Sequence, residues 1–129
     1  MFTIDLLQRV ITQIESLSSK RYTDAQAPFR VIADHIRGAV FMIGDGVLPS
    51  NTEQGYFVRR LLRRSVRYAD VVGMPAGKLA QLAESVITTY GDYYINLTEQ
   101  RELITSEIAR EEDKFRVTLE KGLKQFNKL

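Results

Sequence analysis

Five arginines occupy one short stretch of the sequence, and these residues are the best suited of any in the chain to hold an anionic partner. Residues 55–70 read GYFVRRLLRRSVRYAD, in which the arginines are Arg59, Arg60, Arg63, Arg64 and Arg67. At about 100° per residue of an α-helix, they fall within about 140° of the helix circumference. Leucine and valine residues fall on the opposite side, so the stretch predicts an amphipathic helix with an arginine face.

Like charges at helical spacing destabilise a helix by a few tenths of a kcal/mol per pair. Three such pairs occur here: Arg59 with Arg63, Arg63 with Arg67, and Arg60 with Arg64. We therefore expect anionic groups to offset the arginine face. Phosphates of a nucleic acid could do so, and so could Asp34, Asp45 or carboxylates near the C-terminus of the chain.

The other residues that could do chemistry are few. His35 is the only histidine and the chain has no cysteine, which removes multi-histidine and thiolate metal sites. Asp34 and His35 are adjacent, but neighbouring helical residues point about 100° apart, so we expect His35 to hydrogen-bond inside a bundle. No glycine-rich phosphate loop is present. The residues predict no catalytic site and no metal or cofactor site in this chain.

Composition places the chain among ordinary globular proteins. Of 129 residues, 44% are hydrophobic and 26% are charged, and the formal net charge is +2. The five arginines contribute +5, so the rest of the chain carries a net charge of −3. No run approaches the roughly 18 apolar residues of a membrane span, and the N-terminus MFTIDLLQRV lacks signal-peptide features. We expect a cytoplasmic protein without a membrane association.

Apolar residues recur at helical spacing along nearly the whole chain. They predict helices over residues 4–18, from Pro28 to Ile43, after Gly55, over 79–90 and over about 98–128, with a loop at 44–55. The last segment carries one apolar seam: Ile104, Ile108, Phe115, Leu119, Leu123 and Phe126. The predicted fold is therefore all-α, a single-domain bundle over residues 1–129 of about five helices with a long C-terminal helix.

Residues 29–74 resemble the segment that follows the catalytic core of alanyl-tRNA synthetases, a class II family. Three blocks occur in order, written R-V-I-A-D-H-x-R, D-G-V-x-P-S-N and G-Y-x-x-R-R-x-x-R-R. The flanks are similar too, with IDLL at residues 4–7 and EEDKFRVTLEKG at residues 111–122. The resemblance covers essentially the full chain and implies the helical tRNA-recognition domain of such a synthetase.

The resemblance also implies a role for named residues. In this family the asparagine of Pro-Ser-Asn helps to read a G·U wobble pair in the tRNA acceptor stem, which corresponds here to Asn51 beside Ser50. The five arginines would hold phosphates and position the stem of tRNA-Ala. A second reader, an Asp that follows the long helix in the family, has no counterpart in these residues.

The resemblance further implies that the chemistry of the reaction takes place elsewhere in a larger enzyme. ATP and Mg²⁺ serve the catalytic domain of the family and Zn²⁺ its editing domain, and neither of these nor the oligomerising domain matches this chain. We expect this chain not to aminoacylate tRNA by itself, and the catalytic domain to be one of its partners.

Two other classes of function fit the residues. A helical DNA-binding module could place the arginine helix in a major groove, although the helix lacks the Asn, Gln and Ser mixture common in base readout. A purely structural interaction domain could instead have its basic face covered by other parts of a larger protein.

Overall fold

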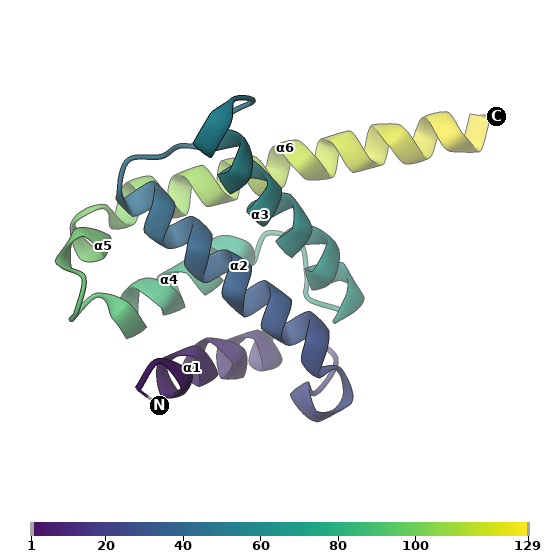
Figure 1. Ribbon diagram of the computed structural model, residues 1–129. Coiled ribbons are helices and arrows are strands. Elements are labelled where there is room, and N and C mark those ends of the chain that lie inside the picture. Colours follow the sequence, from purple (N-terminus) through teal and green to yellow (C-terminus); the bar gives the residue numbers. More distant parts are fainter. Residues whose placement is uncertain (1, 129) are drawn as a thin grey trace.

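Seven helical segments make up the computed structural model (Figure 1), which describes residues 2–128, with side chains from residue 6 to residue 122. Six are α-helices and one is a single 3-10 turn. They are α1 (Phe2–Leu17), η1 (Tyr22–Asp24), α2 (Gln26–Gly44), α3 (Glu53–Val71), α4 (Leu79–Tyr90), α5 (Ile95–Glu99) and α6 (Arg101–Lys128). The described residues contain no strand, which confirms the predicted all-α fold with a long last helix.

The helix α2 lies at the centre of the bundle. It packs against α3, α1, α4 and α6, and α6 packs in turn along α4 and α3. Figure 1 shows α6 crossing the bundle and extending at its C-terminal end beyond the other helices. This arrangement presents α3 on one side of the molecule, between the central helix and the long one.

The periodic apolar residues form the core, as helix amphipathicity requires. On α2, every residue of the predicted stripe is buried: Phe29, Ile32, Ile36, Val40 and Ile43. From the predicted seam of α6, Ile104, Ile108 and Phe115 are buried and Leu119 is partly buried. The side chains of Leu123 and Phe126 lie outside the described residues.

The short helix α5 was not among the predicted segments, which otherwise agree with the all-α bundle of the structure. The sequence suggested a single helix from about Thr98, whereas the structure has a five-residue helix before α6. This short helix buries Leu97 against Gly44, where an added Cβ would lie 2.9 Å from the Leu97 side chain. A five-residue helix is too short to show a period, so this local packing decides the structure there.

Among the described residues, no helix is both long and apolar enough to cross a membrane.

Candidate nucleic-acid interface

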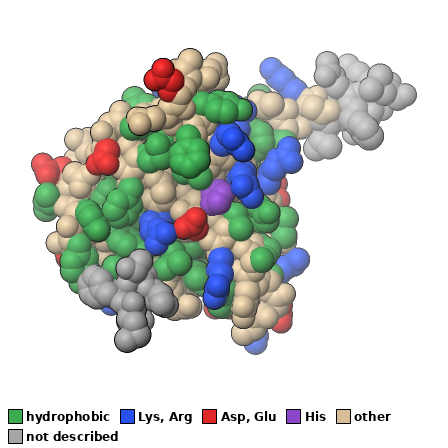
Figure 2. Space-filling view, in the orientation of Figure 1, with side chains coloured by type: hydrophobic (Ala, Val, Ile, Leu, Met, Phe, Trp, Pro, Cys, Tyr) green, Lys and Arg blue, Asp and Glu red, His purple; other side chains and the backbone are tan. Residues whose placement is uncertain are grey.

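The helix α3 carries the predicted arginine face, and the structure divides its five arginines by burial. Arg59 is buried, with 9% of its surface exposed, and Arg63 is half-buried. The other three, Arg60, Arg64 and Arg67, are exposed. Figure 2 shows several blue Lys and Arg side chains close together over α3, on the side where α6 leaves the bundle. The face therefore has an outer part and a part that belongs to the interior.

Glu111 of α6 pairs with both arginines of the inner part. The Arg59 Nε donates to this carboxylate, at 3.3 Å from Oε1 and 3.2 Å from Oε2, and the Arg63 Nε lies 3.2 Å from Oε2. Only 3% of the Glu111 surface is exposed. A carboxylate so deeply buried needs such charged donors, because unpaired ions in the interior cost several kcal/mol.

The other carboxylates considered from the sequence do not contact α3 arginines. Asp34 pairs with Arg37 of its own helix at 2.8 Å, and Asp45 accepts a hydrogen bond from the Asn96 side chain at 3.1 Å. Within the chain, the carboxylate that offsets Arg59 and Arg63 thus comes from α6, which was one of the alternatives considered from the sequence.

Aromatic rings support three of the arginines. The guanidinium carbons of Arg63 and Arg67 lie 5.0 Å and 5.9 Å from the centre of the Phe115 ring, and that of Arg64 lies 6.0 Å from the Tyr68 ring. Such contacts restrict a guanidinium while leaving its N–H edge open to a further acceptor. Arg60 has no ion pair or ring contact within the part of the chain that the structure describes.

The loop before α3 carries the predicted base reader. Asn51 is exposed, and its side-chain oxygen Oδ1 accepts a hydrogen bond from Nη1 of Arg59. Ser50 serves the loop itself, because its hydroxyl donates to the Thr52 carbonyl at 3.1 Å and accepts from the Thr52 N–H at 3.3 Å. Asn51 therefore sits beside the arginine face, tied to it through Arg59, and Ser50 shapes the turn that presents it.

Gly55 allows the loop to lie directly on the first turn of α3. A Cβ at this position would lie 2.1 Å from the Ser50 hydroxyl oxygen and 2.6 Å from the Leu48 carbonyl oxygen. The Ser50 N–H also donates to the Gly55 carbonyl at 3.0 Å. Only glycine permits so close a backbone approach.

Sequence reasoning missed two exposed apolar side chains near Asn51, Leu48 and Phe57. Leu48, Tyr56 and Phe57 are all exposed, Phe57 with 53% of its surface. On the same helical wheel, Tyr56 and Phe57 fall within or next to the arginine sector rather than on the buried side. That position on the wheel is the signal by which Phe57 could have been found.

His35 lies close to this surface without the hydrogen bonds that we expected. Neither ring nitrogen has a hydrogen-bond partner among the described residues, and Nδ1 lies 3.9 Å from the Asp34 carboxylate. The prediction that His35 is hydrogen-bonded inside the bundle is therefore wrong. Burial and the nearby charge of Arg64 lower the pKa of His35, against an opposite effect of Asp34. A neutral ring tolerates such burial better than a charged one.

In the described part of the chain, no group of three or more His, Asp or Glu side chains lies close enough to hold a metal ion.

A cluster of arginines on one face of a helical bundle is the electrostatic footprint common to nucleic-acid-binding domains. A family model described as class II (A) tRNA synthetases matches residues 1–129, and the chain belongs to this family. It is similar over its length to alanine–tRNA ligases. The relative from Borreliella afzelii is 42% identical, with 100% of this chain and 23% of that protein aligned.

Two further alanine–tRNA ligases are 43% identical to the chain. In Exiguobacterium sibiricum the match covers 98% of this chain and 15% of the relative, and in an Anaeromyxobacter species 95% and 14%. The chain thus spans less than a quarter of the length of these curated relatives.

Proposed function

We propose that residues 1–129 form one helical tRNA-recognition domain of an alanine–tRNA ligase, which binds the acceptor stem of tRNA-Ala and helps to select its G·U wobble pair. The observation that carries this proposal is the placement of the exposed Asn51 at the start of α3, bonded to Arg59 on the helix that also carries three exposed arginines, in a chain whose relatives are alanine–tRNA ligases. An amide next to phosphate-binding cations suits a stem held by its backbone and read at one base pair.

The exposed arginines would provide the affinity in this proposal. Arg60, Arg64 and Arg67 are exposed to solvent. Each guanidinium could donate two parallel N–H hydrogen bonds to the oxygens of one phosphate. Arg59 and Arg63 already pair with Glu111. That they also contact the RNA directly is a prediction from the family resemblance. Contacts to phosphates set the register of the stem but do not distinguish sequences.

The whole ligase would provide the remaining functions. We propose no cofactor site in this chain, and assign ATP and Mg²⁺ to the catalytic domain and Zn²⁺ to the editing domain of the enzyme. The catalytic domain would then be a protein partner of this one. Since tRNA is charged where proteins are made, the proposal implies a cytoplasmic location.

A salt-titrated binding assay tests the proposal. The chain is titrated with tRNA-Ala, with the same tRNA carrying a Watson–Crick pair in place of the wobble pair, and with duplex DNA. We expect preference for the wobble pair, and loss of that preference in an Asn51→Ala variant that keeps its salt dependence. Equal binding to the two tRNAs would contradict wobble selection by this chain.

The alternative of a helical DNA-binding or purely structural domain is not favoured by the similarity to alanine–tRNA ligases. The duplex DNA in the same assay covers the first of these. An absence of binding to any nucleic acid at low salt would favour the second.

A further inference from the structure

A continuous set of hydrogen bonds joins the base-reading loop to the long helix. Nη1 of Arg59 donates to Asn51 Oδ1, and the Arg59 Nε donates to Glu111. Arg59 lies on α3, Asn51 on the loop before it and Glu111 on α6, so three separate segments meet in one guanidinium. The two bonds use different nitrogens of Arg59, so neither displaces the other.

The chemistry of Arg59 determines how the Asn51 amide is oriented. A guanidinium has five N–H donors and no acceptor, so the amide atom that faces it must be the oxygen. The NH₂ group of Asn51, an exposed residue, is then the part left to meet an RNA. Its partners would be acceptors that a shallow minor groove presents, such as a pyrimidine O2, a purine N3 or a ribose 2′ oxygen.

Glu111 in turn determines where Arg59 lies. A free arginine side chain samples many rotamers, and holding it in one of them costs conformational entropy. Glu111 is almost completely buried on a helix that packs against both α3 and α4, so its carboxylate has little room to move. The Arg59 side chain is therefore held at its Nε, which places Nη1 at the loop.

We infer that Glu111 is a positioning residue for base recognition: through Arg59, it holds the Asn51 amide with its NH₂ group outward. This inference rests on the proposed function of Asn51 as a base reader. Glu111 itself does not touch the RNA.

The neighbouring carboxylate provides a matched control. Glu112 is as deeply buried as Glu111, but it faces the start of α4, where it accepts from the Gly77 N–H at 2.8 Å and the Leu79 N–H at 3.3 Å. It also pairs with Arg116 at 2.9 Å. A Glu112→Gln variant removes a buried charge from the same turn of α6 without touching the contact between Arg59 and Asn51.

Nuclear magnetic resonance of the Asn51 side chain tests the positioning without RNA. The ¹⁵N order parameter of its NH₂ group is measured in the wild-type chain and in the Glu111→Gln and Glu112→Gln variants. We expect the order parameter to fall in Glu111→Gln and to stay unchanged in Glu112→Gln. Should Glu111→Gln fail to fold, Arg59→Met removes the same link while Glu111 keeps its contact with Arg63.

The consequence for recognition is measured with the two tRNAs. Glu111→Gln should reduce the preference for the wobble pair about fivefold, the effect of one lost hydrogen bond, with little change for the Watson–Crick tRNA. In an Asn51→Ala background, Glu111→Gln should cause no further loss of preference.

The two arms separate failure of this inference from failure of the proposed function. If the wild-type chain shows no preference between the tRNAs while the Asn51 order parameter still depends on Glu111, the proposed function is wrong and the positioning stands. If the order parameter and the preference are both unchanged in folded Glu111→Gln, Glu111 does not position Asn51, whatever Arg59→Met does. If Glu111→Gln does not fold, the same two results in Arg59→Met overturn the inference.

Discussion

Single residues in this chain take different roles even where the sequence makes them look equivalent. Arg59 and Arg60 are neighbours in the motif, yet one is buried in an ion pair and the other is exposed. The amphipathic pattern places both on the polar side of the helix, because a wheel records the direction of a side chain and not what packs above it. The partner that distinguishes them, Glu111, lies 52 positions away in the sequence.

His35 gives a prediction about pH at this scale. Burial and Arg64 lower its pKa below the usual value of about 6.5, so the unfolded chain binds a proton at a higher pH than the folded chain does. The free energy of unfolding should therefore rise with pH between the lowered pKa and about 6.5, and this contribution should be fully present above that window.

Urea unfolding between pH 5 and pH 8 measures this effect, with His35→Gln as the comparison that lacks it. The chain has one histidine, so its imidazole resonance gives the folded-state pKa without an assignment problem. A folded-state pKa at or above 6.5 would contradict the prediction.

At the scale of elements, the long helix α6 holds the arrangement of the others. Adjacent carboxylates on it face different neighbours, since Glu111 pairs with α3 and Glu112 caps the start of α4. Arg116, one turn later, joins Glu112 to Asp70 at the end of α3. The sequence of α6 shows only a mixture of acidic and basic residues, yet its Glu111, Glu112 and Arg116 make the polar contacts that align α3 and α4.

The contact between the loop and α3 leads to a prediction with two glycines. Gly55→Ala would place a Cβ against the Leu48 carbonyl, which has no flexible end to move, and should destabilise the chain by about 2 kcal/mol. Gly122→Ala meets no atom within 4 Å on the exposed side of α6, and should stabilise the chain by about 0.5 kcal/mol through helix propensity.

Chemical denaturation of both variants checks these opposite signs, and Gly55→Ala should in addition weaken preference for the wobble pair because the loop moves. A Gly55→Ala variant as stable as the wild type would show that the loop does not lie against the helix in solution.

The helices could be predicted from the sequence, because burial repeats at every helical turn. The polar contacts between them could not, because each occurs only once. Periodic burial repeats every turn, so α2 and α4 can be read from Phe29 to Ile43 and from Leu79 to Tyr90. The hydrogen bond between Arg59 and Asn51 follows no repeating pattern, because it depends on how the loop packs against α3. Asn51 itself was found through family resemblance and not through its spacing, and the exposed Phe57 was missed.

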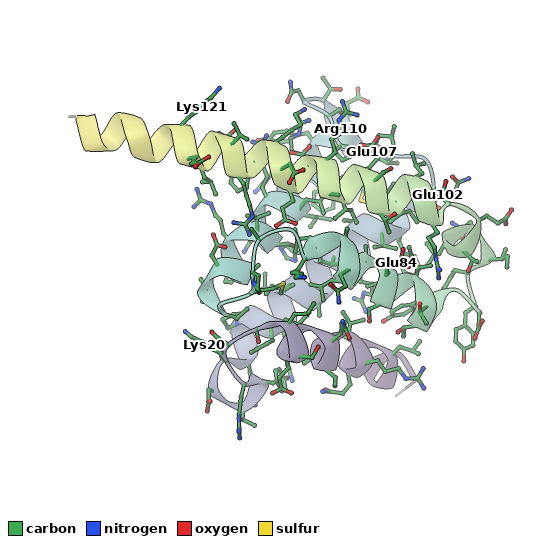
Figure 3. All side chains as sticks on the ribbon, turned by 180° about the vertical axis from the view of Figure 1, so that it is seen from behind. Lys20, Glu84, Glu102, Glu107, Arg110 and Lys121 are labelled. Atoms are coloured by element: carbon green, nitrogen blue, oxygen red, sulfur yellow. The ribbon has the colours of Figure 1, made fainter. Side chains whose placement is uncertain are left out.

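At the scale of the whole molecule, charge is distributed unevenly. Three exposed arginines, Arg60, Arg64 and Arg67, lie together on α3. Figure 3 shows mixed signs on the opposite side, where Glu102, Glu107 and Arg110 follow one another along α6 and Glu84 lies nearby on α4. Glu84 pairs there with Arg101 at 3.4 Å. The small formal net charge of +2 therefore conceals a local cationic surface.

This distribution predicts which arginines set the salt dependence of RNA binding. Arg60→Gln and Arg64→Gln should each reduce the slope of log affinity against log salt by about 1, the effect of one phosphate contact. Arg63→Gln should reduce it by less, because Glu111 already compensates that charge. Binding measured between about 50 and 200 mM salt gives the slopes. An equal reduction by all three substitutions would contradict this division.

We expect the exposed arginines of α3 to give the molecule an electric dipole with its positive end on that side. The electric field of an approaching polyanion would orient the molecule with its arginine face toward the polyanion. A larger fraction of encounters would then occur at that face. Orientation before contact raises the association rate constant and leaves the dissociation rate constant largely unchanged. In stopped-flow kinetics, added salt should therefore lower the association rate constant far more than it raises the dissociation rate constant.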